Sequence, residues 1–403
     1  MNILLIPATD WLRHPVPSRH HHIFETLAET DEVHVLQFDL FPENPPRKTR
    51  TIIHKLKTLP SRGLAQYYLL NLPLYWKKIL EIIKSERIEV VVISNILPGT
   101  PLLFGNLGCK IVIDLKDMFS DNSAIYYQNA AISSVVQGTS EWLLQRLLKS
   151  ANHVITVSAF LVNYLKKIGI TGVSLIPNGA DLTIFKPDLK SKVFGSNPAE
   201  RLEESTVIGF VGTMDRWIDF QTVLTSLKEL SRRIDNLKLL VVGGKMITNY
   251  FDEIKDEVQM AGLQDRVIFT GIVSHLEVPY YVNLMDICLI PMKPDIRLNQ
   301  ARSPDKLFEY LACGKPVVST RLSEVIRLGK NAVEFYDDAQ SLTEVIYKIV
   351  RDASLRDSMK KAALEIAKNH DWRSISEEYR GVLLKVLHSK STRALVVQSE
   401  ISG

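Results

Sequence analysis

Short apolar runs alternate with longer segments of helical periodicity throughout the first half of the chain. The helical segments, at residues 19–29, 67–84 and 141–150, repeat their apolar positions with the spacing of an amphipathic helix. The apolar runs are too short for helices and predict buried strands at residues 3–6, 33–38, 90–94, 111–114, 154–157 and 173–176. Strands that alternate with helices are typical of a doubly wound parallel sheet, so this half is predicted to form an α/β domain.

A second alternating series follows a polar stretch that contains Pro187, Gly195 and Pro198. We interpret residues 186–205 as a linker between a first domain at residues 1–185 and a second at residues 206–370. Its strands are predicted at residues 207–211, 237–242, 267–270, 287–291, 317–320 and 332–335, and a final amphipathic helix at residues 371–388 precedes a tail at residues 389–403. Ligands of such sheets bind beyond the carboxyl ends of the strands, which directs attention to those ends.

The composition limits the number of domains and the class of protein. A chain of 403 residues suits two domains, and its 46% hydrophobic and 23% charged residues are those of a globular protein. A net charge of +4 does not by itself indicate nucleic-acid binding, and Cys109, Cys288 and Cys313 fit neither a metal spacing nor a disulfide framework. No apolar run approaches the ~20 residues that span a bilayer, and Asp10 comes too early for a signal peptide. We therefore expect a cytoplasmic protein, soluble or peripheral to the membrane.

The segment at residues 303–320 predicts a helix with both ends marked, followed at once by a strand. Ser303 is a good N-cap and Pro304 suits the first helical position. Gly314 is the expected C-terminal stop, and Pro316 prevents continuation of the helix. A buried strand then begins at Val317.

The start of this helix has the chemistry of a nucleotide-diphosphate site. Backbone N–H groups and the positive end of the helix dipole suit a phosphate. Lys306 adds a cation within the first turn, and Glu309, three residues further, shares its face. A carboxylate beside a phosphate site suits ribose hydroxyls, so we predict that Glu309 binds ribose.

The same segment resembles the donor-site helix of the GT-B glycosyltransferases, in particular the glycosyltransferase family 4-like group (glycosyl transferases group 1). Residues 304–310 match its "Pro-x-Lys-x-x-Glu-Tyr" version. The opening strand at residues 1–7, the motifs at residues 154–158 and 175–181, and the strand and turn at residues 208–213 also match the family, in family order. The resemblance covers nearly the whole chain.

The resemblance implies two Rossmann-like domains that face a central cleft, with the acceptor on the first and a nucleotide-sugar on the second. It also implies that the helix at residues 371–388 crosses back to the first domain. Two family features are absent: Ala301 replaces the first glutamate of the acidic pair, and Arg216 is the only basic residue of its loop. The residues expected to bind the donor are Gly212, Thr213, Arg216, Gly271, Ser303, Pro304, Lys306, Leu307 and Glu309.

Carboxylates near the predicted strand at residues 111–114 are candidates for the acceptor side. Asp117 could accept the proton of an attacking hydroxyl or position the acceptor, and it is the predicted catalytic residue. Asp114 and Arg19 are predicted to contact the acceptor, with Arg19 suited to an acceptor phosphate. Alternatively, Asp114 caps a turn and Asp117 pairs with a nearby cation.

Three adjacent histidines, at residues 20–22, do not have the spacing of metal ligands, because neighbours on a helix point in different directions. A helix that begins after Ser18 as N-cap is the better interpretation. We expect no metal and no cofactor beyond the nucleotide-sugar co-substrate. Catalysis would then depend on positioning and on fixed cations and dipoles that stabilise the leaving diphosphate.

Residues 44–78 contain no acidic residue. Basic residues with interfacial aromatics suit an anionic membrane surface, so we predict reversible binding to the inner face of the cell membrane. An ordinary solvated loop and helix is the alternative. The residues concerned are Arg47, Lys48, Arg50, Lys55, Lys57, Arg62, Lys77 and Lys78, with Tyr67, Tyr68, Tyr75 and Trp76.

The predicted function is transfer of a sugar from a nucleotide-diphosphate sugar to an acceptor, a lipid-linked or cell-surface polysaccharide intermediate, without a metal. A GT-B epimerase or phosphorylase is one alternative, and the loss of the glutamate at Ala301 keeps a non-catalytic nucleotide-sugar-binding protein open. A dinucleotide dehydrogenase is disfavoured because no Gly-x-Gly-x-x-Gly follows the first strand. The donor base, the sugar, the acceptor, the oligomeric state and the stereochemical course stay open, although the resemblance suggests retention.

Overall fold

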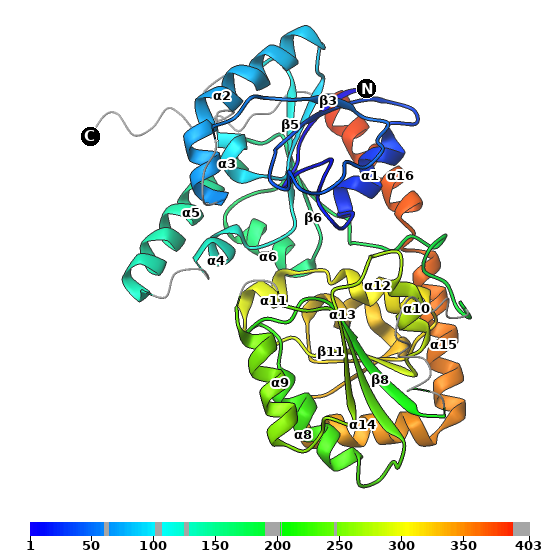
Figure 1. The fold of residues 1–403 in the computed structure, drawn as a ribbon. Helices are drawn as coiled ribbons and strands as arrows, with labels where there is room; N and C mark the ends of the chain where they lie inside the picture. The colour runs from blue at the N-terminus through cyan, green and yellow to red at the C-terminus, as the bar shows by residue number, and fades with distance from the viewer. Residues whose placement is uncertain are drawn as a thin grey trace. The chain divides into compact units, whose positions relative to one another are not determined.

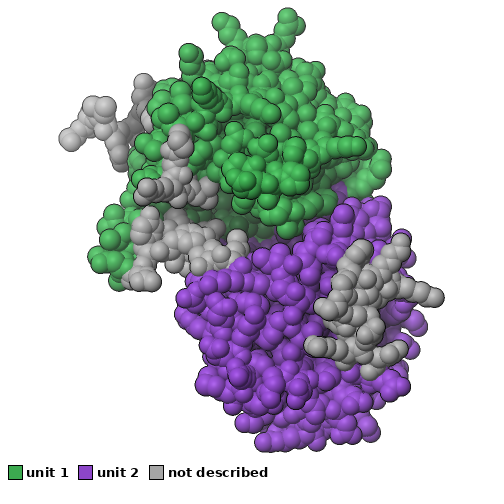
Figure 2. Space-filling model, in the orientation of Figure 1, with its two compact units in different colours: residues 1–177, 373–403 green, residues 178–372 purple. Residues whose placement is uncertain are grey.

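The computed structural model describes residues 1–59, 64–100, 107–124, 129–189, 202, 204–245 and 248–389. These residues group into two compact units, which Figure 2 colours separately. Unit 1 comprises residues 1–177 and 373–403, and unit 2 comprises residues 178–372. The predicted linker at residues 186–205 and the predicted tail at 389–403 lie largely outside the described residues.

Unit 1 contains a parallel sheet of seven strands in the order β3-β2-β1-β4-β5-β6-β7. Its strands are β1 (Asn2–Ile6), β2 (Glu32–Leu36), β3 (Ile52–His54), β4 (Val90–Ile93), β5 (Lys110–Leu115), β6 (His153–Thr156) and β7 (Val173–Leu175). Its helices are α1 (Arg19–Leu27), α2 (Leu64–Ser85), α3 (Ile96–Gly99), α4 (Phe119–Ala124), α5 (Ala130–Ser150), α6 (Ala159–Lys167) and α16 (Trp372–His388).

The central strands of unit 1 are apolar without interruption because both of their faces are covered. Residues 3–6 of β1 are fully buried, and β1 pairs in parallel with both β2 and β4. Continuous burial of this kind is typical of strands in the middle of a doubly wound sheet. The strand order reverses at β1, between β2 on one side and β4 on the other.

Unit 2 contains a parallel sheet of six strands in the order β10-β9-β8-β11-β12-β13. Figure 1 shows these strands between α8 and α9 on one side and α12 and α15 on the other. Its strands are β8 (Thr206–Val211), β9 (Leu237–Val242), β10 (Val267–Gly271), β11 (Ile287–Ile290), β12 (Val317–Ser319) and β13 (Val333–Phe335). Its helices are α8 (Phe220–Leu230), α9 (Tyr250–Met260), α10 (Val278–Asn283), α11 (Arg297–Ala301), α12 (Asp305–Ala312), α13 (Ser323–Gly329), α14 (Ala339–Arg351) and α15 (Ala353–Lys368), with a 3₁₀ turn η2 (Lys330–Ala332).

All twelve strands predicted from the apolar runs are present, and both sheets are parallel, as predicted. Strand β3 was not predicted, because Ile52–His54 is a short, partly exposed strand without an apolar run. Helix α1 begins after Ser18, the predicted N-cap, whose backbone N–H donates to His21 Nδ1 at 2.9 Å. None of the helices in the described part of the chain combines the length and the apolar character needed to cross a membrane.

Candidate functional site

Helix α12 ends where the sequence predicts but begins later. The C-cap is Cys313, Gly314 follows with a φ of +67°, and β12 begins at Val317. The first helical residue is Asp305 and the N-cap position is Pro304, so the prediction of Ser303 as N-cap and Pro304 as first helical residue was wrong by one position. The structural reason lies in the partners of Ser303.

Ser303 is buried and fixes the entry to α12. Its Oγ accepts the backbone N–H of Asn178 at 3.3 Å, and its carbonyl oxygen accepts from Asn178 Nδ2 at 2.8 Å. Its hydroxyl is therefore engaged with a loop instead of the helix amides. The conformation of the chain before α12 thus depends on Asn178.

Helix α12 is also bonded to the carboxyl end of β8. Tyr310, fully buried, accepts the backbone N–H of Val211 on its hydroxyl oxygen at 2.8 Å. Val211 is the last residue of β8, which lies where the strand order of this sheet reverses. Ligands of doubly wound sheets bind at such a reversal, beyond the carboxyl ends of the strands.

Three glycine turns lie side by side at this edge of the sheet. Gly212 donates its N–H to Val242 at 2.9 Å, and Gly243 donates its N–H to Gly271 at 3.0 Å. Gly243 has a φ of +133°, and a Cβ there would lie 2.1 Å from the carbonyl oxygen of Gly212. Glycine is required because the turns touch through their backbones. Gly212, Gly243 and Gly271 therefore form one continuous backbone surface at the strand ends, which we call the strand-end ledge. Gly212 and Gly271 are both predicted to bind the donor.

Lys306 extends from α12 over this ledge. Its Nζ lies 4.2 Å from the ring centroid of Phe210, and a Cβ on Gly212 would lie 2.9 Å from the same atom. Burial lowers the pKa of Lys306 to about 8, although the charge of Glu309 opposes this effect. The structure thus brings together Lys306 and Gly212, which are 94 residues apart, as the shared site predicted.

Glu309 lies one turn further along α12 and contacts a residue that the sequence analysis missed. Its Oε1 is 3.0 Å from His275 Nε2, and both side chains are mostly buried. Burial favours neutral His275, but the hydrogen bond and charge of Glu309 outweigh it and raise the pKa of His275. His275 follows Gly271 by four residues, so a histidine just past the carboxyl end of a predicted strand was the available signal.

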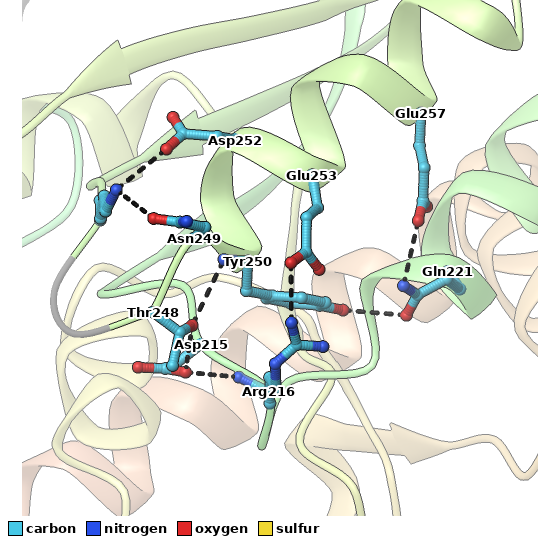
Figure 3. A network of polar contacts seen from close by, with 10 residues as sticks. Asp215, Arg216, Gln221, Thr248, Asn249, Tyr250, Asp252, Glu253 and Glu257 are labelled. Atoms are coloured by element: carbon cyan, nitrogen blue, oxygen red, sulfur yellow. Dashed lines mark hydrogen bonds and ion pairs between the residues drawn. The ribbon is translucent and has the colours of Figure 1, made fainter. Parts of the chain in front are cut away.

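Arg216 lies in the exposed loop after β8 and has partners on α9 (Figure 3). Its Nη2 donates to Glu253 Oε1 at 2.7 Å, and its guanidinium lies 6.0 Å from the ring centroid of Tyr250. The loop is held by buried Asp215, whose Oδ1 accepts from the Arg216 N–H and from Thr248 Oγ1. The Arg216 guanidinium is therefore paired with Glu253, and its binding to the nucleotide-sugar stays a prediction.

The remaining predicted donor residues differ in accessibility. Thr213 is exposed beside Gly212, whereas the side chain of Leu307 is buried, so only its backbone can reach a ligand. Ala301, which stands where the family has its first glutamate, is buried at the end of α11. Because residue 301 is an alanine, the protein has no carboxylate at the position of the family's first glutamate.

In unit 1, Arg19 and Asp114 form a buried ion pair. Arg19 Nε is 3.2 Å from Asp114 Oδ2, and His20 Nε2 is 3.0 Å from the same oxygen. Burial opposes ionisation of Asp114, but the charges of Arg19 and His20 hold its pKa well below the usual range. Burial also lowers the pKa of His20. Charges engaged in this way favour a structural role, and the acceptor contacts of Arg19 and Asp114 stay predictions.

The three adjacent histidines have separate partners. His20 contacts Asp114, whereas His21 Nε2 lies 2.9 Å from the carbonyl oxygen of Trp11. His21 also stacks on the Trp11 ring with centroids 4.2 Å apart, and burial lowers its pKa to about 2. Asp117, the predicted catalytic residue, lies half-buried between β5 and α4, and its role stays a prediction.

The aromatic residues of the basic stretch are mainly buried, which corrects part of the membrane prediction. Tyr67, Tyr68 and Tyr75 pack in unit 1, the latter two against Phe38, because they occupy the inward face of α2. Arg47 is half-buried and donates to a backbone carbonyl, and Arg62 lies outside the described residues. Of the four aromatics, Trp76 is exposed. The outward face of α2 carries Leu69, Leu70, Leu74, Trp76, Lys77, Leu80 and Lys84.

Comparison with known proteins gives each unit a family. Residues 21–184 match the model of Glycosyltransferase Family 4, and residues 205–352 match the model of Glycosyl transferases group 1. A Bacillus subtilis protein provisionally named as the teichuronic acid biosynthesis glycosyltransferase TuaH is 26% identical over 294 residues, which are 71% of this chain and 70% of that protein.

Solved structures have the same fold. A sucrose-phosphate synthase from Thermosynechococcus elongatus superimposes with a TM-score of 0.73 and 18% identity, over 96% of this chain and 98% of that one. The HepE protein of Anabaena, solved in complex with UDP, gives a TM-score of 0.68 and 16% identity, over 96% of this chain and 100% of that one. With the two family models, which together span about three quarters of the sequence, these findings show that the chain belongs to the group 1 and family 4 glycosyltransferases of GT-B fold and is a glycosyltransferase.

Proposed function

We propose that this glycosyltransferase uses a nucleotide-diphosphate sugar and binds it at the strand-end ledge of unit 2. The observation that carries the proposal is the position of Lys306, whose Nζ lies over the Gly212 turn one helical turn before Glu309. A cation, a backbone ledge and a carboxylate in this order match a diphosphate followed by a ribose. The UDP bound in the Anabaena structure supports the same class of donor.

Each donor residue has a distinct role in this proposal. Lys306 and the amides at the start of α12 bind the diphosphate, and the turns at Gly212 and Gly271 allow close approach of the ligand to the backbone. Glu309 accepts hydrogen bonds from the ribose hydroxyls. His275 holds the Glu309 carboxylate in place through their 3.0 Å contact.

In the transfer step, the acceptor hydroxyl oxygen forms a bond to the anomeric carbon of the sugar. The bond from that carbon to the β-phosphate oxygen breaks, and the nucleoside diphosphate leaves with the electron pair. The hydroxyl proton passes to the carboxylate of Asp117. Lys306 stabilises the charge that develops on the diphosphate, so we propose that no metal is needed for this purpose.

The acceptor in this proposal is a lipid-linked or cell-surface polysaccharide intermediate, met at a membrane. Similarity to a protein assigned to teichuronic acid biosynthesis supports a cell-envelope glycan. The outward face of α2 supports membrane contact, because Leu70, Leu74 and Trp76 are exposed there beside Lys77. Exposed apolar residues flanked by cations suit an anionic membrane surface. We propose that the protein binds the inner face of the cell membrane reversibly through this helix.

The donor site is tested by titrating the chain with UDP, GDP, ADP and UDP-glucose in a calorimeter, with and without EDTA. We expect one nucleotide to bind to wild type, to bind at least ~10-fold more weakly to Glu309→Gln, and to be unaffected by EDTA. As a matched control, Glu334→Gln changes a partly exposed glutamate of the edge strand β13 that pairs with Lys348 of α14. Absence of binding by every nucleotide would refute the proposed donor site.

The membrane surface is tested by co-sedimentation with vesicles of phosphatidylglycerol or of phosphatidylcholine. Wild type should sediment with the anionic vesicles only, and Leu70→Gln/Leu74→Gln should stay in the supernatant. The control variant Met260→Gln/Ile326→Gln removes two exposed apolar side chains of unit 2 and should sediment like wild type. Equal sedimentation of all three proteins would exclude α2 as the contact.

A further inference from the structure

Unit 1 contains a second polar cluster, built from three elements, whose residues have no part in the donor or acceptor sites proposed above. Glu32 and His34 belong to β2, His54 is the last residue of β3, and Glu86 directly follows α2. One ligand atom each of Glu32, His34 and Glu86 lies within 4.8 Å of the other two. Imidazole nitrogen and carboxylate oxygen are both ligands of divalent first-row metals.

The strand geometry explains why these side chains meet. Glu32 and His34 are two residues apart on β2 and therefore lie on the same face of the sheet. His54 pairs with Leu36 in the parallel register, so it shares this face on the neighbouring strand. The cluster is thus a product of the fold, and its spacing in the sequence does not reveal it.

The imidazole of His34 is fully buried and fixed at both nitrogens. Its Nε2 lies 3.1 Å from Glu32 Oε1, and its Nδ1 lies 2.9 Å from His54 Nε2. The His34 and His54 rings stack with centroids 5.1 Å apart. A metal-binding histidine usually donates its second N–H to an acceptor that orients the ring, and His54 is in that position.

We propose that Glu32, His34 and Glu86 bind one divalent first-row cation of the Zn²⁺ class, with His54 as the residue that orients His34. Nε2 of His34 and one oxygen from each carboxylate are the protein ligands, and water completes the coordination. Nδ1 of His34 donates its proton to Nε2 of His54.

Distances and charge both suit this ion. Ligand atoms of a tetrahedral zinc site are about 3.3 Å apart, since each lies ~2.0 Å from the metal. The 3.1 Å between His34 Nε2 and Glu32 Oε1 already matches, and the half-buried Glu86 has a carboxylate oxygen within 4.8 Å of a ligand atom of each of the other two residues. Two carboxylates and a neutral imidazole balance the charge of a divalent cation, which also relieves the repulsion between the carboxylates.

The nitrogen ligand selects the class of metal. Mg²⁺ and Ca²⁺ prefer sites made entirely of oxygen, whereas imidazole suits Zn²⁺, and Zn²⁺ binds such sites more tightly than Mn²⁺. The ion would join β2 to the segment that ends α2. It would act by fixing the end of this helix and has no part in sugar transfer.

The test is calorimetric titration of the chelator-treated full chain with ZnCl₂. We expect one Zn²⁺ per chain and loss of this binding, by at least ~100-fold in affinity, in Glu32→Gln and in Glu86→Gln. His54→Asn should weaken binding by ~10- to 100-fold without removing a ligand. Replacement by Co²⁺ should give visible absorption bands that disappear in Glu86→Gln.

Two variants control for other sites. Glu89→Gln changes a nearby carboxylate that accepts the backbone N–H of Asn2 at 2.8 Å, and it should bind Zn²⁺ like wild type. His22→Gln tests the run of three histidines and should also leave the affinity unchanged. The proposal is overturned if wild type binds no Zn²⁺, or if binding survives in both Glu32→Gln and Glu86→Gln.

Discussion

Two ion pairs, one in each unit of this protein, differ in how far they are exposed. The pair of Arg19 and Asp114 in unit 1 has side chains only 2% and 0% exposed, with Arg19 Nε 3.2 Å from Asp114 Oδ2. The pair of His275 and Glu309 in unit 2 is 15% and 14% exposed and lies beside the backbone ledge at Gly212 and Gly271. A fully buried ion pair suits a role in stability. A partly exposed charge beside the glycine turns can instead contact a ligand.

Removal of the Asp114 charge should produce the largest effect. Asp114→Asn leaves Arg19 buried without its anion, so we expect a loss of about 3 to 5 kcal/mol in the free energy of unfolding of unit 1. Urea denaturation followed by circular dichroism measures this loss. Asp117→Asn is the matched control and should cost less than ~1 kcal/mol while abolishing sugar transfer. Similar stability of the two variants would contradict a structural role for the Asp114 charge.

Loss of the Lys306 charge should affect binding and leave folding intact. In Lys306→Met the diphosphate loses a charged hydrogen bond, so affinity for the best nucleoside diphosphate should fall by about 10- to 150-fold. Calorimetry measures this change, and the unfolding midpoint should not decrease, because a partly buried charge has been removed. The control Lys238→Met changes a lysine near the amino-terminal end of β9, away from the carboxyl ends of the strands. This variant should bind the nucleotide like wild type. A large drop in its affinity would contradict the assigned site.

Nucleotide affinity should also decrease at alkaline pH. The pKa of Lys306 is lowered to about 8 in the free protein, and a bound diphosphate raises it again. Above pH ~8 binding therefore requires uptake of a proton, and affinity should fall by up to ~10-fold per pH unit. Calorimetry from pH ~7.5 to ~9 checks this, with Lys306→Met as the reference. A fall of equal size in the variant would assign the titration to another group.

The smallest effect concerns the exposed pair of Arg216 and Glu253. Exposed ion pairs contribute less than ~1 kcal/mol, so Glu253→Gln should leave the unfolding midpoint nearly unchanged. Release of Arg216 should raise nucleotide affinity by ~2- to 3-fold if this cation reaches the donor. The double variant Arg216→Ala/Glu253→Gln should lose the gain. An unchanged affinity in Glu253→Gln would remove Arg216 from the donor site.

The sheets could be predicted because their strands are continuous apolar runs, and α12 because Gly314 and Pro316 mark its end. Lys306 and Glu309 could be predicted because both belong to one short helix. The partners of these residues could not, since Gly243 and His275 reach the site through strand pairing and a loop. The same limit explains Asp114, whose partner Arg19 is 95 residues away and reached only through the folded core.

Basic and aromatic residues of the stretch at 44–78 could not be assigned to faces from composition. Tyr68 and Tyr75 are seven residues apart, which places them on one face of a helix, and that face is the buried one. Three apolar residues between them, Leu69, Leu70 and Leu74, are exposed. Helical periodicity therefore predicts which residues share the buried face of α2, whereas composition alone does not.

Helix α16 has a consequence for the order in which the protein can fold during synthesis. Its Tyr379 is fully buried in unit 1, with its ring 5.6 Å from that of Phe24, and its Arg380 pairs with Asp31. These residues leave the ribosome only after all of unit 2. Unit 1 is therefore synthesised first but completed last, and during translation Phe24 and Asp31 lack their partners on α16 until the end of the chain has been made.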